Sequence, residues 1–188
     1  MINLELVIAL TGASGVIYGI QLLKVLRDSK VKTHLIISDP AKVIIKHELK
    51  LDVKEIERFA NFVYNPSDLT APIASGSYKV NGMVIVPCSM KTLSAIVSGY
   101  ADNLIVRAAD CMLKEKRPLI LVPRETPLSI IHLRNLVKAA EAGAIIIPAM
   151  PGFYHRPKTI EDLVNFVVGK ILDMLGIQHD LYRRWRGE

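Results

Sequence analysis

Residues 4–16 read LELVIALTGASGV, an apolar run followed by a turn of small residues. The run LELVIAL predicts a short β-strand that is buried on both faces. Glycine and alanine add almost no bulk to the turn, so its backbone N–H groups can approach a ligand closely. A helical pattern begins at about residue 15. The stretch therefore predicts a strand, a ligand-binding turn and a helix in succession.

The same alternation of apolar strands and helical patterns continues along the chain. Strands are predicted at 4–10, 33–38, 83–87, 119–123 and 144–148, and helices at 15–29, 39–50, 89–99, 102–116, 129–142 and 159–175. This order predicts an α/β protein with a parallel sheet covered by helices on both faces. At 188 residues we expect one domain spanning 1–188, with an extended tail from about residue 178 to 188. The segment 60–82 is the least regular part.

The last predicted helix has the clearest pattern. Its apolar residues recur at i, i+3 and i+4 from Ile160 to Leu175, and Thr159 with Asp162 resembles a capping box. Lys170 lies at the margin of this apolar face. Its long side chain could therefore reach a neighbouring surface while its stem packs.

Composition excludes several classes of protein. No apolar run approaches the roughly 20 residues of a membrane span, and the N-terminus carries Glu5 and lacks a basic leader, so we expect a cytoplasmic protein. Cys88 and Cys111 have no CxxC spacing and predict reduced thiols. The net charge of +6 gathers in LKEKRP and LYRRWRGE rather than on one dense basic face, so we expect no nucleic-acid partner.

The residues that follow the predicted strands form a consistent set. In an open parallel sheet, ligands bind at the carboxyl ends of the strands. Those ends carry Thr11 to Gly15, Ser38, the segment Cys88 to Thr92, Arg124 with Glu125, and the segment PAMPGFYHRP. We expect these hydroxyl, basic, acidic and tyrosine side chains to share one edge. Such an edge suits a phosphorylated, partly aromatic ligand.

Each of these features also has a simpler interpretation. TGASG is neither GxGxxG nor a P-loop, Ser14 lacks the GxSxG elbow of hydrolases, and the segment could be a plain strand-to-helix turn. Ser89 could serve only as a helix N-cap, and Arg124 with Glu125 could form a surface pair. The histidines at 34, 47, 132, 155 and 179 show no metal-ligand spacing, so we expect no metal site.

Longer segments carry a specific resemblance. TGASGVIYG, PCSMKTLSAIVSGYADNLIVRAAD, LKEKRPLILVPRETPLSIIHLRN and PAMPGFYHRPKTIEDLVNFVVGKIL closely resemble the UbiX family of flavin prenyltransferases, from about residue 5 to 177. The resemblance implies a three-layer flavodoxin-like (Rossmann-like) fold and a homododecamer with sites at subunit junctions. It implies transfer of a dimethylallyl group from dimethylallyl monophosphate to reduced FMN. The product, prenylated FMN, would be delivered to UbiD-type decarboxylases.

The resemblance also implies roles for individual residues. The predicted FMN-binding residues are Gly12, Ala13, Ser14, Ser38, Ser89, Met90, Lys91, Thr92 and Arg124. Those predicted to bind the prenyl phosphate are Tyr154, Lys170, Arg107 and Lys114, and the predicted catalytic residues are Ser14, Glu48 and Glu125. Cations around the leaving phosphate, an acid to protonate it and a dry allyl pocket suit this chemistry without a metal.

Two positions depart from the family pattern. Leu69 stands where relatives often have a tryptophan, so the isoprenoid site keeps apolar volume but loses a π face. Lys170 stands where relatives often have arginine, and it lacks the bidentate fork. These departures leave the choice between monophosphate and diphosphate donors open.

Two other functions compete with the transferase. An FMN-dependent cysteine decarboxylase should carry PASANT and PxMNxxMW, whereas this chain has PCSMKT and PAMPGFYH. A non-catalytic FMN-binding or electron-transfer module should be acidic and carry a T-x-T-G-x-T loop, whereas this chain is basic and lacks that loop. Both alternatives are therefore disfavoured.

Overall fold

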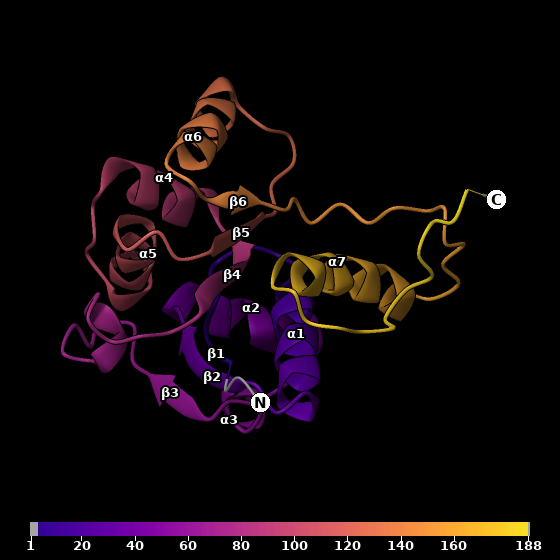
Figure 1. Ribbon diagram of the computed structural model, residues 1–188, viewed down its shortest axis with the longest axis horizontal. Coiled ribbons are helices and arrows are strands. Elements are labelled where there is room, and N and C mark those ends of the chain that lie inside the picture. Colours follow the sequence, from indigo (N-terminus) through magenta and orange to yellow (C-terminus); the bar gives the residue numbers. More distant parts are fainter. Residues whose placement is uncertain (1–3, 188) are drawn as a thin grey trace.

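A single parallel sheet organises the chain (Figure 1). The computed structural model describes residues 4–187. Its six strands lie in the order β3-β2-β1-β4-β5-β6, and every neighbouring pair is parallel. Their bounds are β1 Glu5–Leu10, β2 Lys32–Ile37, β3 Phe62–Tyr64, β4 Gly82–Cys88, β5 Leu119–Pro123 and β6 Ile145–Ile146.

Helices cover both faces of this sheet. One face packs against α1 (Val16–Asp28), α2 (Asp39–Leu49) and α7 (Ile160–Met174). The other packs against α4 (Met90–Ser98), α5 (Leu104–Lys114) and α6 (Ile130–Glu141). Side chains alternate along β1, so that Leu6, Ile8 and Leu10 enter the first core while Val7 and Ala9 enter the second. The predicted three-layer α/β fold is confirmed.

Three short elements were not predicted. They are α3 (Val53–Glu57), which begins with a capping box of Asp52 and Glu55, strand β3, and a 3₁₀ turn at Pro72–Ala74. Strand β3 pairs with β2 at the sheet edge, inside the segment predicted to be irregular. Three residues are too few to show an alternating pattern, and the exposed Phe62 and Val63 give no core signal.

Strand β3 changes the formal topology without moving the ligand-binding edge. The five predicted strands alone give the flavodoxin order 2-1-3-4-5, and β3 extends it to 3-2-1-4-5-6. In both, the connections reverse direction between β1 and β4. The rule for open sheets therefore places a ligand at the carboxyl ends of these two strands.

Two segments without helix or strand extend beyond the sheet on the same side of the molecule (Figure 1). We call residues 147–159, between β6 and α7, the arm, and residues 178–187 the tail. Ring contacts join them: Tyr154 and Trp185 lie 5.8 Å apart between ring centroids. The tail also returns to α7, where Tyr182 lies 5.0 Å from Phe166. Among residues 4–187, no helix is long and apolar enough to span a bilayer.

Candidate functional site

A cavity of about 280 Å³ lies where β1, β2 and β4 end. It contains five predicted FMN-binding residues: Gly12, Ser38, Ser89, Lys91 and Thr92. The rest of its wall consists of Asp39, Pro40, Pro66, Ala95, Asp102, Asn103 and Ile105. We call it the strand-end cavity. Side chains from distant parts of the sequence therefore meet at the edge where parallel strands favour a ligand.

Helix N-termini give the strand-end cavity its electrostatic character. Ser38 caps α2 and its Oγ accepts a hydrogen bond from the Ala41 N–H at 3.3 Å. Ser89 caps α4 in the same way, accepting from the Thr92 N–H at 3.2 Å. Backbone N–H groups at helix N-termini and the Lys91 ammonium all favour an anion. The Asp39 and Asp102 carboxylates also line this cavity, so a phosphate group suits the N–H and hydroxyl donors at Ser38 and Ser89 beside Lys91.

A buried threonine fixes the distance between the ends of β1 and β4. The Thr11 hydroxyl donates to the Pro87 carbonyl at 2.8 Å and accepts from the Ser89 N–H at 2.8 Å. Thr11 is almost completely buried, so water does not compete for these bonds. Thr11 thereby holds the turn after β1 against the N-terminus of α4.

The turn of small residues is tightly constrained. A Cβ at Gly12 would lie 2.6 Å from the Pro40 Cβ, too close for any other residue without a shift of α2. Gly15 has a φ of 92°, a left-handed conformation that favours glycine, and its N–H donates to Glu48 Oε2 at 3.0 Å. Glu48 is therefore held beside the turn that carries the exposed Ser14, while Ala13 is buried.

Three further predicted residues follow strand ends: Arg124 and Glu125 follow β5, and Met90 follows β4. Arg124 follows the strand directly, and its Nε is buried without a hydrogen-bond partner among the described residues. Glu125 is exposed and its Oε1 accepts from the Thr126 N–H at 3.1 Å. Met90, the first residue of α4, is partly buried. A buried, unpaired guanidinium N–H is costly, so Arg124 suits a position that a bound ligand or a second copy of the chain completes.

Sequence reasoning missed much of the cavity wall. Asn103 caps α5, and its Oδ1 accepts from the Ile105 and Val106 N–H groups. Pro66 belongs to the irregular segment, and its carbonyl accepts from the Leu104 N–H at 2.8 Å. Asn103 could have been found as an Asn immediately before an apolar helix. Pro66 carried no such signal, because its position depends on a contact between distant segments.

Tyr154 and Lys170 lie elsewhere in the chain. Tyr154 lines a second cavity of about 290 Å³, formed by Tyr154, His155, Arg156, Arg183, Arg184, Trp185 and Arg186. We call it the arm cavity. Lys170 is exposed on α7, with its Nζ 3.8 Å from Asp173 Oδ2. The expectation that Tyr154 shares the edge of the sheet with the other strand-end residues is wrong within one chain, because the arm leads away from the sheet (Figure 1).

Asp173 joins the tail to α7. Its carboxylate accepts hydrogen bonds from Tyr182 Oη at 2.6 Å and from the Arg184 guanidinium at 2.6 Å, and contacts His179 Nε2 at 3.1 Å. Partial burial of the carboxylate raises its pKa, but the bonds from Arg184, Tyr182 and His179 outweigh this effect and lower the pKa to about 2. Asp173 is therefore a charged anchor at neutral pH.

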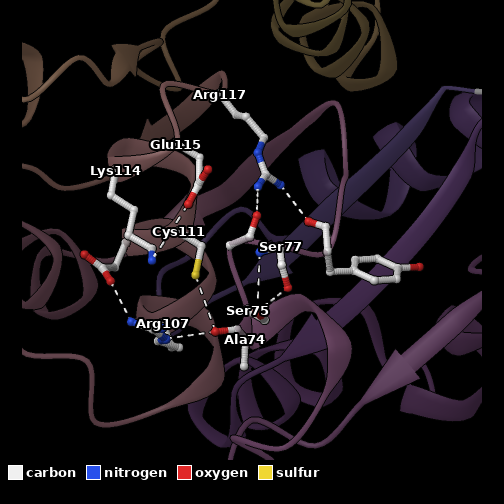
Figure 2. Close-up of polar contacts among 11 residues, drawn as sticks. Ala74, Ser75, Ser77, Arg107, Cys111, Lys114, Glu115 and Arg117 are labelled. Carbon is white, nitrogen blue, oxygen red and sulfur yellow. Dashed lines mark hydrogen bonds and ion pairs between the residues drawn. The ribbon is translucent and has the colours of Figure 1, made fainter.

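Arg107 and Lys114, both on α5, do not line the strand-end cavity. The Arg107 Nε donates to the Ala74 carbonyl at 2.9 Å (Figure 2), and its Nη1 pairs with Asp110 at 2.8 Å. Lys114 ends α5 and lies 3.8 Å from Glu115, which lines an opening beside Glu5 at the start of β1. Within one chain, Arg107 therefore holds the loop at Ala74, and Lys114 lies towards the opposite edge of the sheet.

Cys88 and Cys111 are both buried free thiols. Burial raises the pKa of the Cys88 thiol to about 12, so it stays protonated and a poor nucleophile. No cluster of three or more His, Cys, Asp and Glu side chains suited to a metal ion occurs within residues 4–187.

Comparisons with known proteins agree with this geometry. The flavoprotein family model matches residues 1–172. The flavin prenyltransferase UbiX of Methanothermobacter thermautotrophicus is 53% identical over 183 residues, covering 97% of this chain and 96% of the relative. The structure of AnUbiX with FMN and dimethylallyl pyrophosphate has a TM-score of 0.97 and 47% identity, covering 99% of each chain.

Two further structures show how far the likeness extends. A dodecameric FMN-dependent UbiX-like decarboxylase from Escherichia coli O157:H7 has a TM-score of 0.95 and 45% identity, covering 98% of this chain and 100% of that one. The FMN-dependent cysteine decarboxylase TvaF has a TM-score of 0.63 and 19% identity, covering 77% of this chain and 89% of that one, and so shares the fold alone. The chain belongs to the UbiX family of flavin prenyltransferases, within the wider flavoprotein family.

Proposed function

We propose that this chain transfers a dimethylallyl group from dimethylallyl monophosphate to reduced FMN, making prenylated FMN for UbiD-type decarboxylases. The observation that carries the proposal is the strand-end cavity, where three helix N-termini, Lys91 and Gly12 of the TGASG turn converge. The near-full-length likeness to UbiX flavin prenyltransferases supports the same chemistry.

The residues of the strand-end cavity suit FMN. In our proposal Ser38, Ser89, Lys91 and Thr92 hold its phosphate and ribityl hydroxyls, since they supply hydroxyls, N–H groups and one positive charge. Gly12, Ala13 and Ser14 lie against the ring system, and the unpaired Nε of Arg124 donates to a flavin or phosphate oxygen. Met90 adds apolar contact. When bound in reduced form, FMN supplies the nucleophilic ring that accepts the prenyl group.

We further propose that the complete site draws on more than one copy of the chain. Tyr154 and Lys170 belong to the arm and α7, and Arg107 and Lys114 do not line the strand-end cavity. If a neighbouring copy of the chain supplies some of these four side chains, all of them can surround the donor phosphate. The dodecameric relative of Escherichia coli O157:H7 supports a homododecamer.

The proposed roles follow from the charge that the reaction releases. Breaking the allylic carbon–oxygen bond leaves a phosphate, and cationic side chains stabilise the leaving oxygens. Lys170, Arg107 and Lys114 carry that charge in the proposal, Tyr154 donates a hydrogen bond, and Glu125 supplies a proton. Glu48, held at the Gly15 N–H, and Ser14 exchange protons at the edge of the acceptor ring.

The experiment is anaerobic and uses the purified protein. The protein is mixed with reduced FMN and dimethylallyl monophosphate without added metal, and the mass of the extracted flavin is measured by mass spectrometry. We expect a gain of one five-carbon prenyl unit. Unchanged FMN with both the monophosphate and the diphosphate would contradict the proposal and favour a passive flavin-binding module, and release of carbon dioxide from a cysteine peptide would favour the decarboxylase.

The proposal also covers the cellular location of the protein and its domain organisation. We place the activity in the cytoplasm, where Cys88 and Cys111, both buried free thiols, would remain reduced. We treat residues 1–188 as one flavoprotein domain, because the described strands share a single sheet. Fractionation of the native cells tests the first expectation, and a single cooperative unfolding transition tests the second.

A further inference from the structure

A buried hydrogen-bond network lies at the edge of the sheet, away from the residues assigned to the reaction. His34 of β2 is completely buried, and its Nε2 lies 2.6 Å from Glu5 Oε1 at the start of β1. The same Glu5 oxygen accepts a hydrogen bond from Tyr78 Oη at 2.8 Å. On the other side of the imidazole ring, His34 Nδ1 lies 3.0 Å from Tyr64 Oη. We call these four side chains the clamp, because they join β1, β2, β3 and the loop before β4.

The hydrogen bonds of the clamp determine which groups donate. A carboxylate can only accept, so His34 Nε2–H and Tyr78 O–H both donate to Glu5. In the neutral ring Nδ1 is then the acceptor, and the Tyr64 O–H donates to it. The bond to Glu5 raises the pKa of Tyr78 to about 12, and burial raises the pKa of Tyr64. Burial also raises the pKa of Glu5, but the bonds from His34 and Tyr78 outweigh this effect and lower it.

Ring packing reinforces the clamp at β3. The His34 ring stacks on Phe62 and Tyr64, with centroids 4.8 and 5.7 Å apart, and meets Tyr78 edge-on at 5.6 Å. Strand β3 has only three residues, and Phe62 and Val63 are both about half exposed. Hydrophobic burial therefore contributes little to the attachment of β3, and the contacts with His34 contribute much of it.

The two tyrosines of the clamp lie at the two ends of one segment. Residues 65–77, which we call the wall segment, contain no helix or strand apart from the 3₁₀ turn. Pro66 of this segment lines the strand-end cavity, and its carbonyl accepts from the Leu104 N–H at 2.8 Å, next to the cap residue Asn103. Only one residue separates Tyr64 from Pro66. A shift of Tyr64 would therefore move the wall of the cavity.

The end of the wall segment is held by arginines. Arg107 donates to the Ala74 carbonyl at 2.9 Å (Figure 2). Arg117 donates to the Gly76 carbonyl. At the beginning of the segment, the clamp and the Pro66 carbonyl provide the corresponding contacts. The clamp is thus best placed to control the part of the segment that forms the cavity wall.

We propose that the clamp positions the wall segment, so that Glu5 and His34 are positioning residues for flavin binding although neither lines the strand-end cavity. The inference rests on the proposed function, which assigns that cavity to FMN. Breaking the clamp should raise both the Kd for FMN and the KM for reduced FMN. It should leave kcat within about twofold of wild type, because the clamp does not touch the reacting atoms.

The first test removes one hydroxyl group and measures FMN binding to the assembled protein. Tyr64→Phe keeps the ring stack but loses the bond to His34, and we expect Kd for FMN to rise about three- to tenfold. Tyr182→Phe is the matched control, because Tyr182 also donates a hydrogen bond, to Asp173, but lines neither cavity. Both variants should lower Tm by about 2–4 °C, whereas only Tyr64→Phe should change Kd for FMN.

The second test uses the single acceptor oxygen of Glu5. Glu5→Gln keeps an Oε1 that can accept both bonds, so FMN affinity should stay within about twofold of wild type. Glu5→Leu removes the acceptor, and the affinity should fall at least about fivefold. Hydrogen exchange measured by mass spectrometry should be faster in residues 65–77 of Tyr64→Phe. In Tyr182→Phe it should be faster in the tail alone.

The results separate this inference from the proposed function. Unchanged FMN affinity in Tyr64→Phe, an equal loss of affinity in Tyr182→Phe, or unchanged exchange in the wall segment would each overturn the inference. Wild-type protein that does not bind FMN would overturn it as well. Wild-type protein that binds FMN but does not prenylate it would overturn the proposed function alone, because the comparison of FMN affinities requires no chemistry.

Discussion

The strand-end cavity and the arm cavity are both suited to phosphate, but different chemical groups supply their hydrogen-bond donors and positive charge. In the first, Ser38 and Ser89 lie at helix N-termini, and Thr11 ties two strand ends together. In the second, long arginine side chains surround Tyr154, and one carboxylate, Asp173, anchors the tail. Helix N-termini fixed at the strand ends give a rigid site, whereas long arginine side chains can adopt many rotamers.

The largest effect is expected where the backbone itself forms the wall. Gly12→Ala places a Cβ 2.6 Å from the Pro40 Cβ, so the start of α2 must move away from the cavity. We expect the FMN affinity to fall by about 100-fold and the free energy of unfolding to fall by about 1–3 kcal/mol. Fluorescence titration with FMN and urea unfolding measure the two effects.

Gly76→Ala is the matched control for this substitution. Its new Cβ meets only the carboxylate end of the flexible Glu115 side chain, away from both cavities. FMN affinity should therefore stay within about twofold of wild type. Equal loss of FMN affinity in the two variants would show that the strand-end cavity is not the flavin site.

Lys170→Ala comes next, because it removes a charge that we place on the leaving phosphate. We expect kcat/KM to fall by about 30- to 1,000-fold, equivalent to about 2–4 kcal/mol of transition-state stabilisation, with FMN affinity unchanged. Lys170→Arg should retain most of the activity, since it keeps the charge. Lys54→Ala, at an exposed lysine on α3, is the control for loss of a positive charge. A Lys170→Ala variant with full activity would remove Lys170 from the donor site.

A smaller effect is expected when the tail loses its anchor. Asp173→Asn should weaken tail docking by about 1–2 kcal/mol, because the charge-assisted bonds from Arg184 and Tyr182 become neutral. The emission of Trp185 should shift to the red at pH 7, and limited proteolysis should cut the tail faster.

The pH dependence of tail docking gives a second test of the Asp173 anchor. In the docked state its pKa is lowered from 3.8 to about 2, so docking is fully stabilised above about pH 4 and weakens as the pH falls towards 2. The Trp185 emission of wild-type protein should follow this range. If Asp173→Asn shows the same acid transition, another group is responsible for it.

The smallest effect concerns Leu69, which is half-exposed. Leu69→Trp restores a π face near the predicted isoprenoid site, and we expect kcat/KM with dimethylallyl monophosphate to rise about threefold. Leu69→Phe should give part of this gain, and Leu69→Ile should give none. A gain from isoleucine would assign the effect to volume rather than to the π face.

Much of the fold and of the strand-end cavity is predictable because both are encoded locally. A buried strand, a small-residue turn and a helix follow one another at Glu5–Asp28, and the capping serines directly precede α2 and α4. Parallel strands then bring their carboxyl ends to one edge by topology alone. The strands at 33–38, 83–87 and 119–123 were placed within about two residues of their positions in the structure. The five-residue prediction at 144–148 exceeds β6, which is only Ile145–Ile146.

The remaining features could not be predicted because they depend on contacts between segments that no local pattern links. The partners of Arg107 at Ala74 and of Asp173 on the tail lie outside any helical or strand period. Tyr154 follows a strand in sequence, yet its arm turns away from the sheet to meet Trp185. By itself, the sequence determined the layers, the strand-end cavity and the family. Only the tertiary structure decided where the arm, the tail and the long cationic side chains lie, because packing and charge pairing across the chain, rather than hydrophobic periodicity, set their positions.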